Sequence, residues 1–150
     1  SEGIKINLKN AKVLDLFSGT GSFGIECLSR GASEVFFFEN YNISLKILRK
    51  NLSKLSLEKK TKVFEKNIYE IDDNLFDNKK FDIIFLDPPF NDDKVVLLIN
   101  KIKKLDIISN NTLIIIHRNK KTEDNIPSFF RIERKEVYGL SKIIFGKLFF

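Results

Sequence analysis

The sequence is poor in the residues that build disulfide scaffolds, metal sites and membrane spans. Its 150 residues include one cysteine, one histidine, three prolines and neither methionine nor tryptophan. Cys27 alone cannot form an internal disulfide, and Cys27 with His117 cannot supply a set of metal ligands. No apolar run approaches the roughly 20 residues that a membrane span requires, and no charged-then-apolar leader opens the chain. We therefore expect a cytoplasmic protein without metal, disulfide or membrane partner.

Length and composition are those of one globular domain. Hydrophobic residues make up 43% and charged residues 31% of the sequence, and a chain of this size buries roughly two thirds of the surface that it exposes when unfolded. No repeat, low-complexity block or linker divides it, so we predict a single domain over residues 1–150. The 26 basic and 20 acidic residues give a net charge of +6, which is compatible with an anionic partner but does not identify one.

Apolar spacing predicts alternating strands and helices. Continuous apolar runs indicate buried strands, and apolar residues three or four positions apart indicate helices. The expected strands cover residues 12–17, 35–38, 62–65, 81–86, 113–116, 129–137 and 143–150, with helical segments at 22–30, 45–55, from 68 and at 92–104. This alternation predicts an α/β fold: a doubly wound, mostly parallel seven-stranded sheet that ends in an antiparallel hairpin strand.

A glycine-rich turn follows the first expected strand. Residues 19–24, Gly-Thr-Gly-Ser-Phe-Gly, fit the G-x-G-x-x-G pattern, and Glu39 ends the next strand 20 residues after Gly19. The glycines let the backbone approach a ligand, and a carboxylate at Glu39 can accept both ribose hydroxyls. The pattern alone fits any adenosine-bearing cofactor, including NAD.

Two further features favour S-adenosylmethionine over NAD. Asp15 lies just before the turn, where a carboxylate would repel a pyrophosphate but attract the amino group of a methionine. Residues 87–90, Asp-Pro-Pro-Phe, end the fourth strand. A hydride-transferring dehydrogenase has no use for such a motif, although Asp-Pro alone is also a common strand stop.

Together these residues resemble the RsmD family, Rossmann-like methyltransferases that modify guanine N2 in small-subunit (16S) ribosomal RNA. The resemblance rests on residues 15–21, residues 24–32, Glu39, Asn67 and residues 87–90. It implies S-adenosylmethionine as the cofactor, ribosomal RNA within the small subunit as the partner, and a monomer. The residues implied in holding the cofactor are Phe17, Ser18, Gly19, Thr20 and Gly21 for the methionine part, Glu39 for the ribose, and Asn67 and Ile68 for the adenine.

The Asp-Pro-Pro-Phe turn fits chemistry on an exocyclic amino group. The Asp87 carboxylate and the Pro88 carbonyl can each accept one N–H, which holds the nitrogen lone pair toward the methyl group. Phe90, beside Pro89, can stack on the base. We expect Asp87, Pro88 and Phe90 to be catalytic, and Pro89 and Phe90 to contact the substrate.

Position in the sheet divides the basic residues. Ligands of a parallel sheet bind at the carboxyl ends of its strands. Our candidates for phosphate contacts are Arg118, Lys120 and Lys121 after the fifth strand, Lys94 after the Asp-Pro-Pro-Phe turn and Lys142 in the hairpin turn. Lysines such as Lys59 and Lys60 precede strands and belong to the opposite edge. We expect Cys27 to pack in the core and His117, which ends a buried strand, to be structural.

Two other functions stay open. A methyltransferase that acts on adenine N6 in DNA would use the same chemistry. A nucleotide-binding or scaffold domain would have no catalytic activity. RsmD relatives also carry a segment before the first strand that contributes to the cofactor lid and the RNA surface. Because this chain starts about ten residues before that strand, we expect it to lack the segment.

Overall fold

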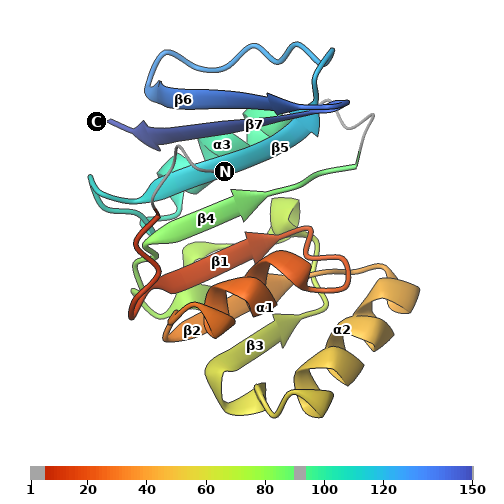
Figure 1. The fold of residues 1–150 in the computed structure, drawn as a ribbon. Coiled ribbons are helices and arrows are strands. Elements are labelled where there is room, and N and C mark those ends of the chain that lie inside the picture. Colours follow the sequence, from red (N-terminus) through yellow and green to blue (C-terminus); the bar gives the residue numbers. More distant parts are fainter. Residues whose placement is uncertain (1–5, 90–93, 150) are drawn as a thin grey trace.

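The computed structural model describes residues 6–89 and 94–149, and these form one mixed sheet flanked by helices (Figure 1). The parallel part of the sheet contains β1 (Lys12–Leu16), β2 (Glu34–Phe38), β3 (Thr61–Phe64), β4 (Ile83–Leu86) and β5 (Leu113–Asn119), and the terminal hairpin contains β6 (Phe130–Tyr138) and β7 (Ser141–Leu148). The helices are α1 (Ser22–Ser29), α2 (Asn42–Lys54) and α3 (Val95–Lys104), with short 3-10 turns at Glu58–Lys60, Ile68–Glu70 and Asp73–Phe76. Within the described residues no helix is both long and apolar enough to cross a membrane.

The strand order is β3-β2-β1-β4-β5-β7-β6. Strands β1 to β5 are parallel, and β7 runs antiparallel to both of its neighbours. The predicted doubly wound, seven-stranded sheet with an antiparallel hairpin strand is therefore confirmed. Because the chain leaves β1 in one direction and later returns to its other side as β4, the order reverses between these two strands, which is where ligands of such sheets bind.

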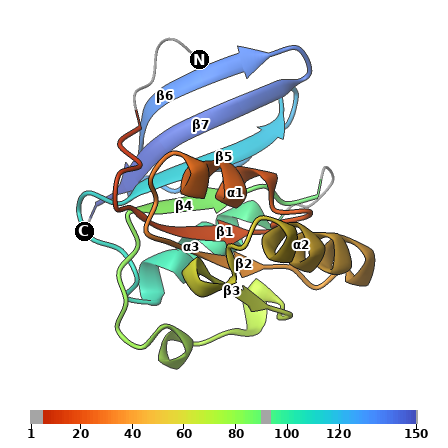
Figure 2. The ribbon, with the colours of Figure 1, turned by 60° about the horizontal axis from the view of Figure 1, so that its bottom comes forward.

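Two hydrophobic clusters cover the two faces of the sheet. The helices lie on both sides of the sheet, with α1 and α2 on one side and α3 on the other (Figure 2). On one face α1 and α2 bury Cys27 and Leu48, and on the other α3 buries Leu98 and Ile102. The predicted packing role of Cys27 is confirmed, since only 2% of it is exposed. Burial, with a smaller contribution from Asp15, raises the pKa of the Cys27 thiol to about 12, so the thiol stays protonated.

The terminal hairpin is less buried than its sequence suggests. Phe145 and Leu148 are core residues, but Phe149 is 48% exposed, and Phe150 lies outside the described residues. Most side chains of β6 are exposed because this strand forms the edge of the sheet. Within the expected strand at 143–150, Phe145 thus belongs to the core, whereas Phe149 is half exposed.

Candidate functional site

The candidate site lies at the carboxyl edge, which we define as the edge formed by the carboxyl ends of β1, β2, β4 and β5. Asp15, Phe37, Phe85 and Ile115 lie in register on these four strands. Alternate residues of a strand point to the same face. Two positions after Phe37, Phe85 and Ile115 come Glu39, Asp87 and His117. Their side chains are therefore expected on the same face of the sheet as Asp15.

The glycine turn joins β1 to α1 through left-handed backbone conformations. Gly19 has φ of 56°, Gly21 has φ of 89°, and Phe17 adopts φ of 61° although it is bulky. A side chain at Gly21 would also overlap Leu48 of α2. A left-handed bulky residue is strained, and such strain concentrates at functional turns. The turn is thus held in a conformation that glycine permits and that brings the backbone to the mouth of the site.

Close packing fixes the start of α1 against β2. A Cβ atom added to Gly24 would overlap the Phe37 ring, so only glycine lets the helix approach this closely. The Ser18 hydroxyl donates to the Asp15 carbonyl over 2.7 Å, and the Asn51 side-chain amide donates to the Thr20 carbonyl over 3.2 Å. These contacts hold the turn from both sides.

Glu39 faces the glycine turn from the end of β2. Its Oε1 accepts the Gly19 N–H over 2.6 Å, and its Oε2 accepts the Tyr41 N–H over 2.9 Å. Gly19 and Glu39, which are 20 residues apart in the sequence, are thus in direct contact. A carboxylate oxygen has more than one lone pair, so Glu39 can still accept a hydroxyl.

Asp15 is the buried carboxylate of the site. It is 1% exposed, and neither carboxylate oxygen has a hydrogen-bond partner among the described residues. Its pKa is raised to about 8, chiefly by burial and in smaller part by the nearby charges of Asp87 and Glu39. The carboxylates of Glu39 and Asp87 thus lie near the buried Asp15 carboxyl, and their negative charge attracts a cation and repels a pyrophosphate.

A small cavity opens beside the ends of β1, β2 and β3. Phe17, Glu39, Asn67 and Ile68 are among the residues that line it. The Asn67 Oδ1 accepts the Tyr69 N–H over 2.9 Å and caps the following turn, which leaves the Asn67 amide N–H groups as donors. The structure thus brings the residues predicted for adenosine to one place, next to the glycine turn.

The Asp-Pro-Pro turn follows β4 at the same edge. Asp87 has a side chain that is 44% exposed, Pro88 is buried, and Pro89 is exposed. Phe90, expected to stack on a base, lies outside the described residues. The Asp87 Oδ1 lies 2.8 Å from Nδ1 of His117.

His117 is the site residue that the sequence pattern missed. We expected a structural role because it ends an apolar strand, yet its side chain is 35% exposed and bonded to Asp87. Leu86 and Ile116 are paired in register on β4 and β5, so the residues after them are neighbours. Only the pairing of β4 with β5, which apolar spacing does not specify, could have revealed this contact.

Arg118 requires a correction. It is 4% exposed, and its guanidinium binds both carboxylate oxygens of Asp124, over 2.9 and 3.1 Å. Such a buried pair cannot reach an RNA phosphate without breaking, which is costly. Lys120 and Lys121 follow at the same edge and are exposed. Lys142 is also wrong as a phosphate contact, because it is buried and its ammonium donates to the Thr122 carbonyl. The exposed candidates are therefore Lys94, Lys120 and Lys121.

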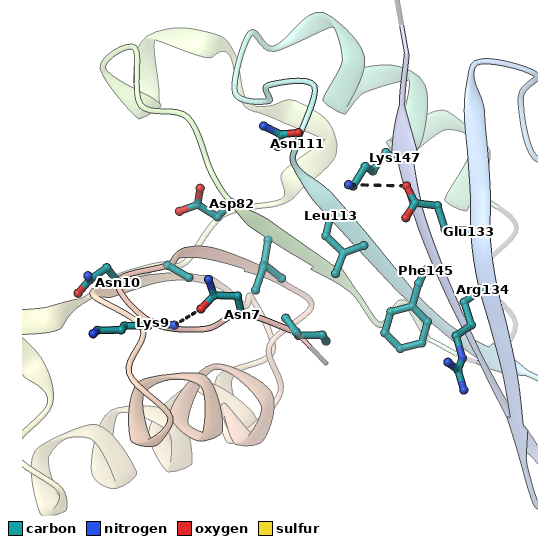
Figure 3. A pocket seen from close by; sticks show the side chains of 13 residues that line it. Asn7, Lys9, Asn10, Asp82, Asn111, Leu113, Glu133, Arg134, Phe145 and Lys147 are labelled. Atoms are coloured by element: carbon teal, nitrogen blue, oxygen red, sulfur yellow. Dashed lines mark hydrogen bonds and ion pairs between the residues drawn. The ribbon is translucent and has the colours of Figure 1, made fainter. Parts of the chain in front are cut away.

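A larger cavity lies away from this site (Figure 3). It has a volume of about 770 Å³ at the amino ends of β1, β4 and β5, with Asn10, Asp82, Leu113 and Phe145 among its lining residues. Asp82 accepts the Lys12 N–H, so this carboxylate has a structural partner. None of the residues predicted for cofactor or substrate lines this cavity.

Comparisons with known proteins agree with this geometry. A sequence model of the family described as conserved hypothetical protein 95 matches residues 2–147. The chain belongs to this RsmD-like methyltransferase family. It is 29% identical over 130 residues to ribosomal RNA small subunit methyltransferase D of Buchnera aphidicola (strain APS), covering 87% of this chain and 67% of that protein.

A second relative and a solved structure are also similar to this chain. The Haemophilus influenzae ribosomal RNA small subunit methyltransferase D is 27% identical over 134 residues, covering 89% of this chain and 69% of that protein. The solved structure of a conserved hypothetical protein of Streptococcus pyogenes shares the fold with a TM-score of 0.80 and 24% identity, covering 92% of this chain and 86% of that one. This chain is thus an RsmD-like methyltransferase with the fold of its relatives.

Proposed function

We propose that the protein transfers a methyl group from S-adenosylmethionine to the exocyclic N2 amino group of a guanine in small-subunit (16S) ribosomal RNA. The observation that carries the proposal is the placement of Asp87, an accessible carboxylate beside the glycine turn at the carboxyl edge. Two relatives named ribosomal RNA small subunit methyltransferase D support the RNA substrate. The choice of guanine N2 follows from the resemblance of the motifs.

The charges of the site support a cationic cofactor. S-adenosylmethionine carries a sulfonium and a cationic amino group, which the negative charges of Glu39 and Asp87 attract and which would favour the ionised form of Asp15. The two Asp15 oxygens lack partners among the described residues, and a buried unpaired carboxyl is stabilised by a cation that approaches it. Glu39 would bind the ribose, and Asn67 with Ile68 would bind the adenine in the adjoining cavity.

The transfer requires the amino group to be positioned rather than activated by a metal or a covalent intermediate. The cofactor supplies a methyl group that forms a bond to nitrogen while its bond to sulfur breaks, sulfur keeps the bonding electrons, and the nitrogen then releases one proton. Asp87 and the Pro88 carbonyl accept the two N–H groups, and Asp87 is placed to take the released proton. Good alignment of this kind can contribute about 7 to 11 kcal/mol.

The base must leave its stack to reach Asp87. Unstacking costs a few kcal/mol, and stacking on an aromatic side chain returns about 1 to 3 kcal/mol per base. Phe90, which follows Asp-Pro-Pro in the sequence, is the proposed aromatic partner. The two magnitudes are compatible with an unpaired or flipped guanine as the substrate.

The test is labelled methyl transfer by the wild type and Asp87→Ala. We expect the wild type to label small ribosomal subunits rather than duplex DNA, and Asp87→Ala to lose nearly all activity because the amino group loses its acceptor. S-adenosylhomocysteine should still raise the melting temperature of the variant, since ligand binding stabilises the folded state. Asp82→Ala, at the opposite end of β4, is the matched control and should keep its activity.

Labelling of duplex DNA instead of small subunits would favour the adenine N6 alternative. Absence of any transfer by the wild type, or full transfer by Asp87→Ala, would contradict the proposed function.

A further inference from the structure

The single histidine of the sequence lies against the carboxylate on which the proposed chemistry depends. His117 Nδ1 and Asp87 Oδ1 are 2.8 Å apart. We propose that His117 is a positioning residue for methyl transfer: its Nδ1–H holds Oδ1 of Asp87, so that Oδ2 is the oxygen presented to the substrate amino group. This inference rests on the proposed function and adds a residue to its site.

The frame around His117 is rigid, which suits a positioning role. β5 lies inside the sheet between β4 and β7, and His117 is paired with Ile143 of β7. Asp87, in contrast, follows the end of its strand, and its side chain is 44% exposed. An exposed carboxylate rotates freely unless another group fixes one of its oxygens. The ring of His117 is the group that the fold provides for this purpose.

The direction of the hydrogen bond follows from the chemistry of the two groups. An ionised carboxylate accepts hydrogen bonds only, so the hydrogen between them must be on Nδ1. This fixes the neutral ring as the Nδ1–H tautomer and leaves Nε2 without a hydrogen. A donor at Oδ1 also stabilises the negative charge of Asp87, which lies near the carboxyl groups of Asp15 and Glu39.

Two substitutions of His117 separate this role from packing. His117→Leu fills the space and removes the donor, whereas His117→Asn keeps an N–H attached to Cγ, near the position of Nδ1. With saturating RNA and cofactor we expect His117→Leu to lower kcat roughly 10- to 100-fold, the effect of losing one hydrogen bond to a charged group. We expect His117→Asn to restore kcat to within about threefold of the wild type, with an unchanged KM for S-adenosylmethionine in both variants.

A second measurement does not depend on catalysis. Because the sequence has one histidine, the ¹⁵N NMR spectrum of the protein labelled at histidine reports this ring alone. At about pH 9, where imidazoles are ordinarily neutral, the wild type should show the Nδ1–H tautomer. Asp87→Ala should lose this preference, because the acceptor that selects the tautomer is gone.

The outcomes distinguish this inference from the proposed function. If the wild type methylates small subunits but His117→Leu does so equally fast, or His117→Asn is as slow as His117→Leu, the positioning role is wrong. An identical tautomer in the wild type and Asp87→Ala would also overturn it. Failure of the wild type to methylate contradicts the proposed function instead, and leaves the NMR result to decide whether the His117–Asp87 contact exists in solution.

Discussion

Asp15 lies beneath the glycine turn with both carboxylate oxygens enclosed by protein atoms. Its pKa is raised to about 8, chiefly by burial. A carboxyl with a raised pKa binds its proton in the folded state at a pH where the unfolded chain has already released it. The free energy of unfolding therefore falls as the pH rises from about 4 to about 8, and the loss is complete above the folded pKa.

This sign gives a prediction for Asp15→Asn. Asparagine cannot ionise, so the variant should lack this part of the pH dependence, and its melting temperature relative to the wild type should rise between about pH 5 and pH 8. A difference on the order of a few kcal/mol is expected over this range. Thermal unfolding of both proteins across the range is the measurement. A constant difference at every pH would show that Asp15 is ionised in the folded protein.

Asp15 also shows how burial can serve binding. A cationic amino group would pair with the Asp15 carboxylate and offset the cost of its ionisation. Binding of S-adenosylmethionine should therefore raise the free energy of unfolding, which the burial of Asp15 lowers. Asp87 differs because it is accessible and bonded to His117. The two carboxylates thus have different environments and different proposed roles.

At the scale of elements, the segment from β1 through α1 was largely predictable from sequence. An apolar run, closely spaced glycines and an apolar helical stripe each depend on local conformation, and Gly21 and Gly24 are required by local φ and close packing. The position of Glu39 at the end of β2 was also predicted, whereas its hydrogen bond with the Gly19 N–H was not.

Contacts between distant elements were not predictable in the same way. The pair His117–Asp87 depends on the register of β4 with β5, and the pair Arg118–Asp124 depends on a loop that folds back over its own strand. Neither leaves a periodic signal in the sequence. Arg118 was therefore placed correctly at the carboxyl edge but given the wrong role, because the buried carboxylate of Asp124 already neutralises its charge.

The loop after β5 gives a prediction at this scale. Lys120 and Lys121 are exposed at the carboxyl edge, and each phosphate contact contributes about 0.7 to 0.9 to the slope of log affinity against log salt. Lys120→Ala with Lys121→Ala should weaken RNA binding at low salt and reduce this slope by roughly 1 to 2. Binding titrations at several salt concentrations measure it.

Lys59→Ala with Lys60→Ala is the matched control. These lysines precede β3 at the opposite edge, so their removal changes the net charge equally without changing the proposed RNA surface. An equal loss of slope in both double variants would mean that net charge, rather than the carboxyl edge, determines binding.

In the molecule as a whole, the net charge and the charge of the candidate site have opposite signs. The net charge of +6 favours an anionic partner, yet the site itself gathers three carboxylates that favour a cationic ligand. Several lysines away from the site are paired with acids, including Lys79 with Glu34 and Lys80 with Asp106. This distribution is compatible with an anionic RNA bound at the surface and a cationic cofactor bound in the candidate site.

The central claim is the chemical identity of the product. After incubation of the wild type with labelled S-adenosylmethionine and small ribosomal subunits, the ribosomal RNA is digested and its nucleosides are separated. We expect the label to be found in N2-methylguanosine. Label in a methylated adenosine or cytidine, or RNA without any label, would contradict it.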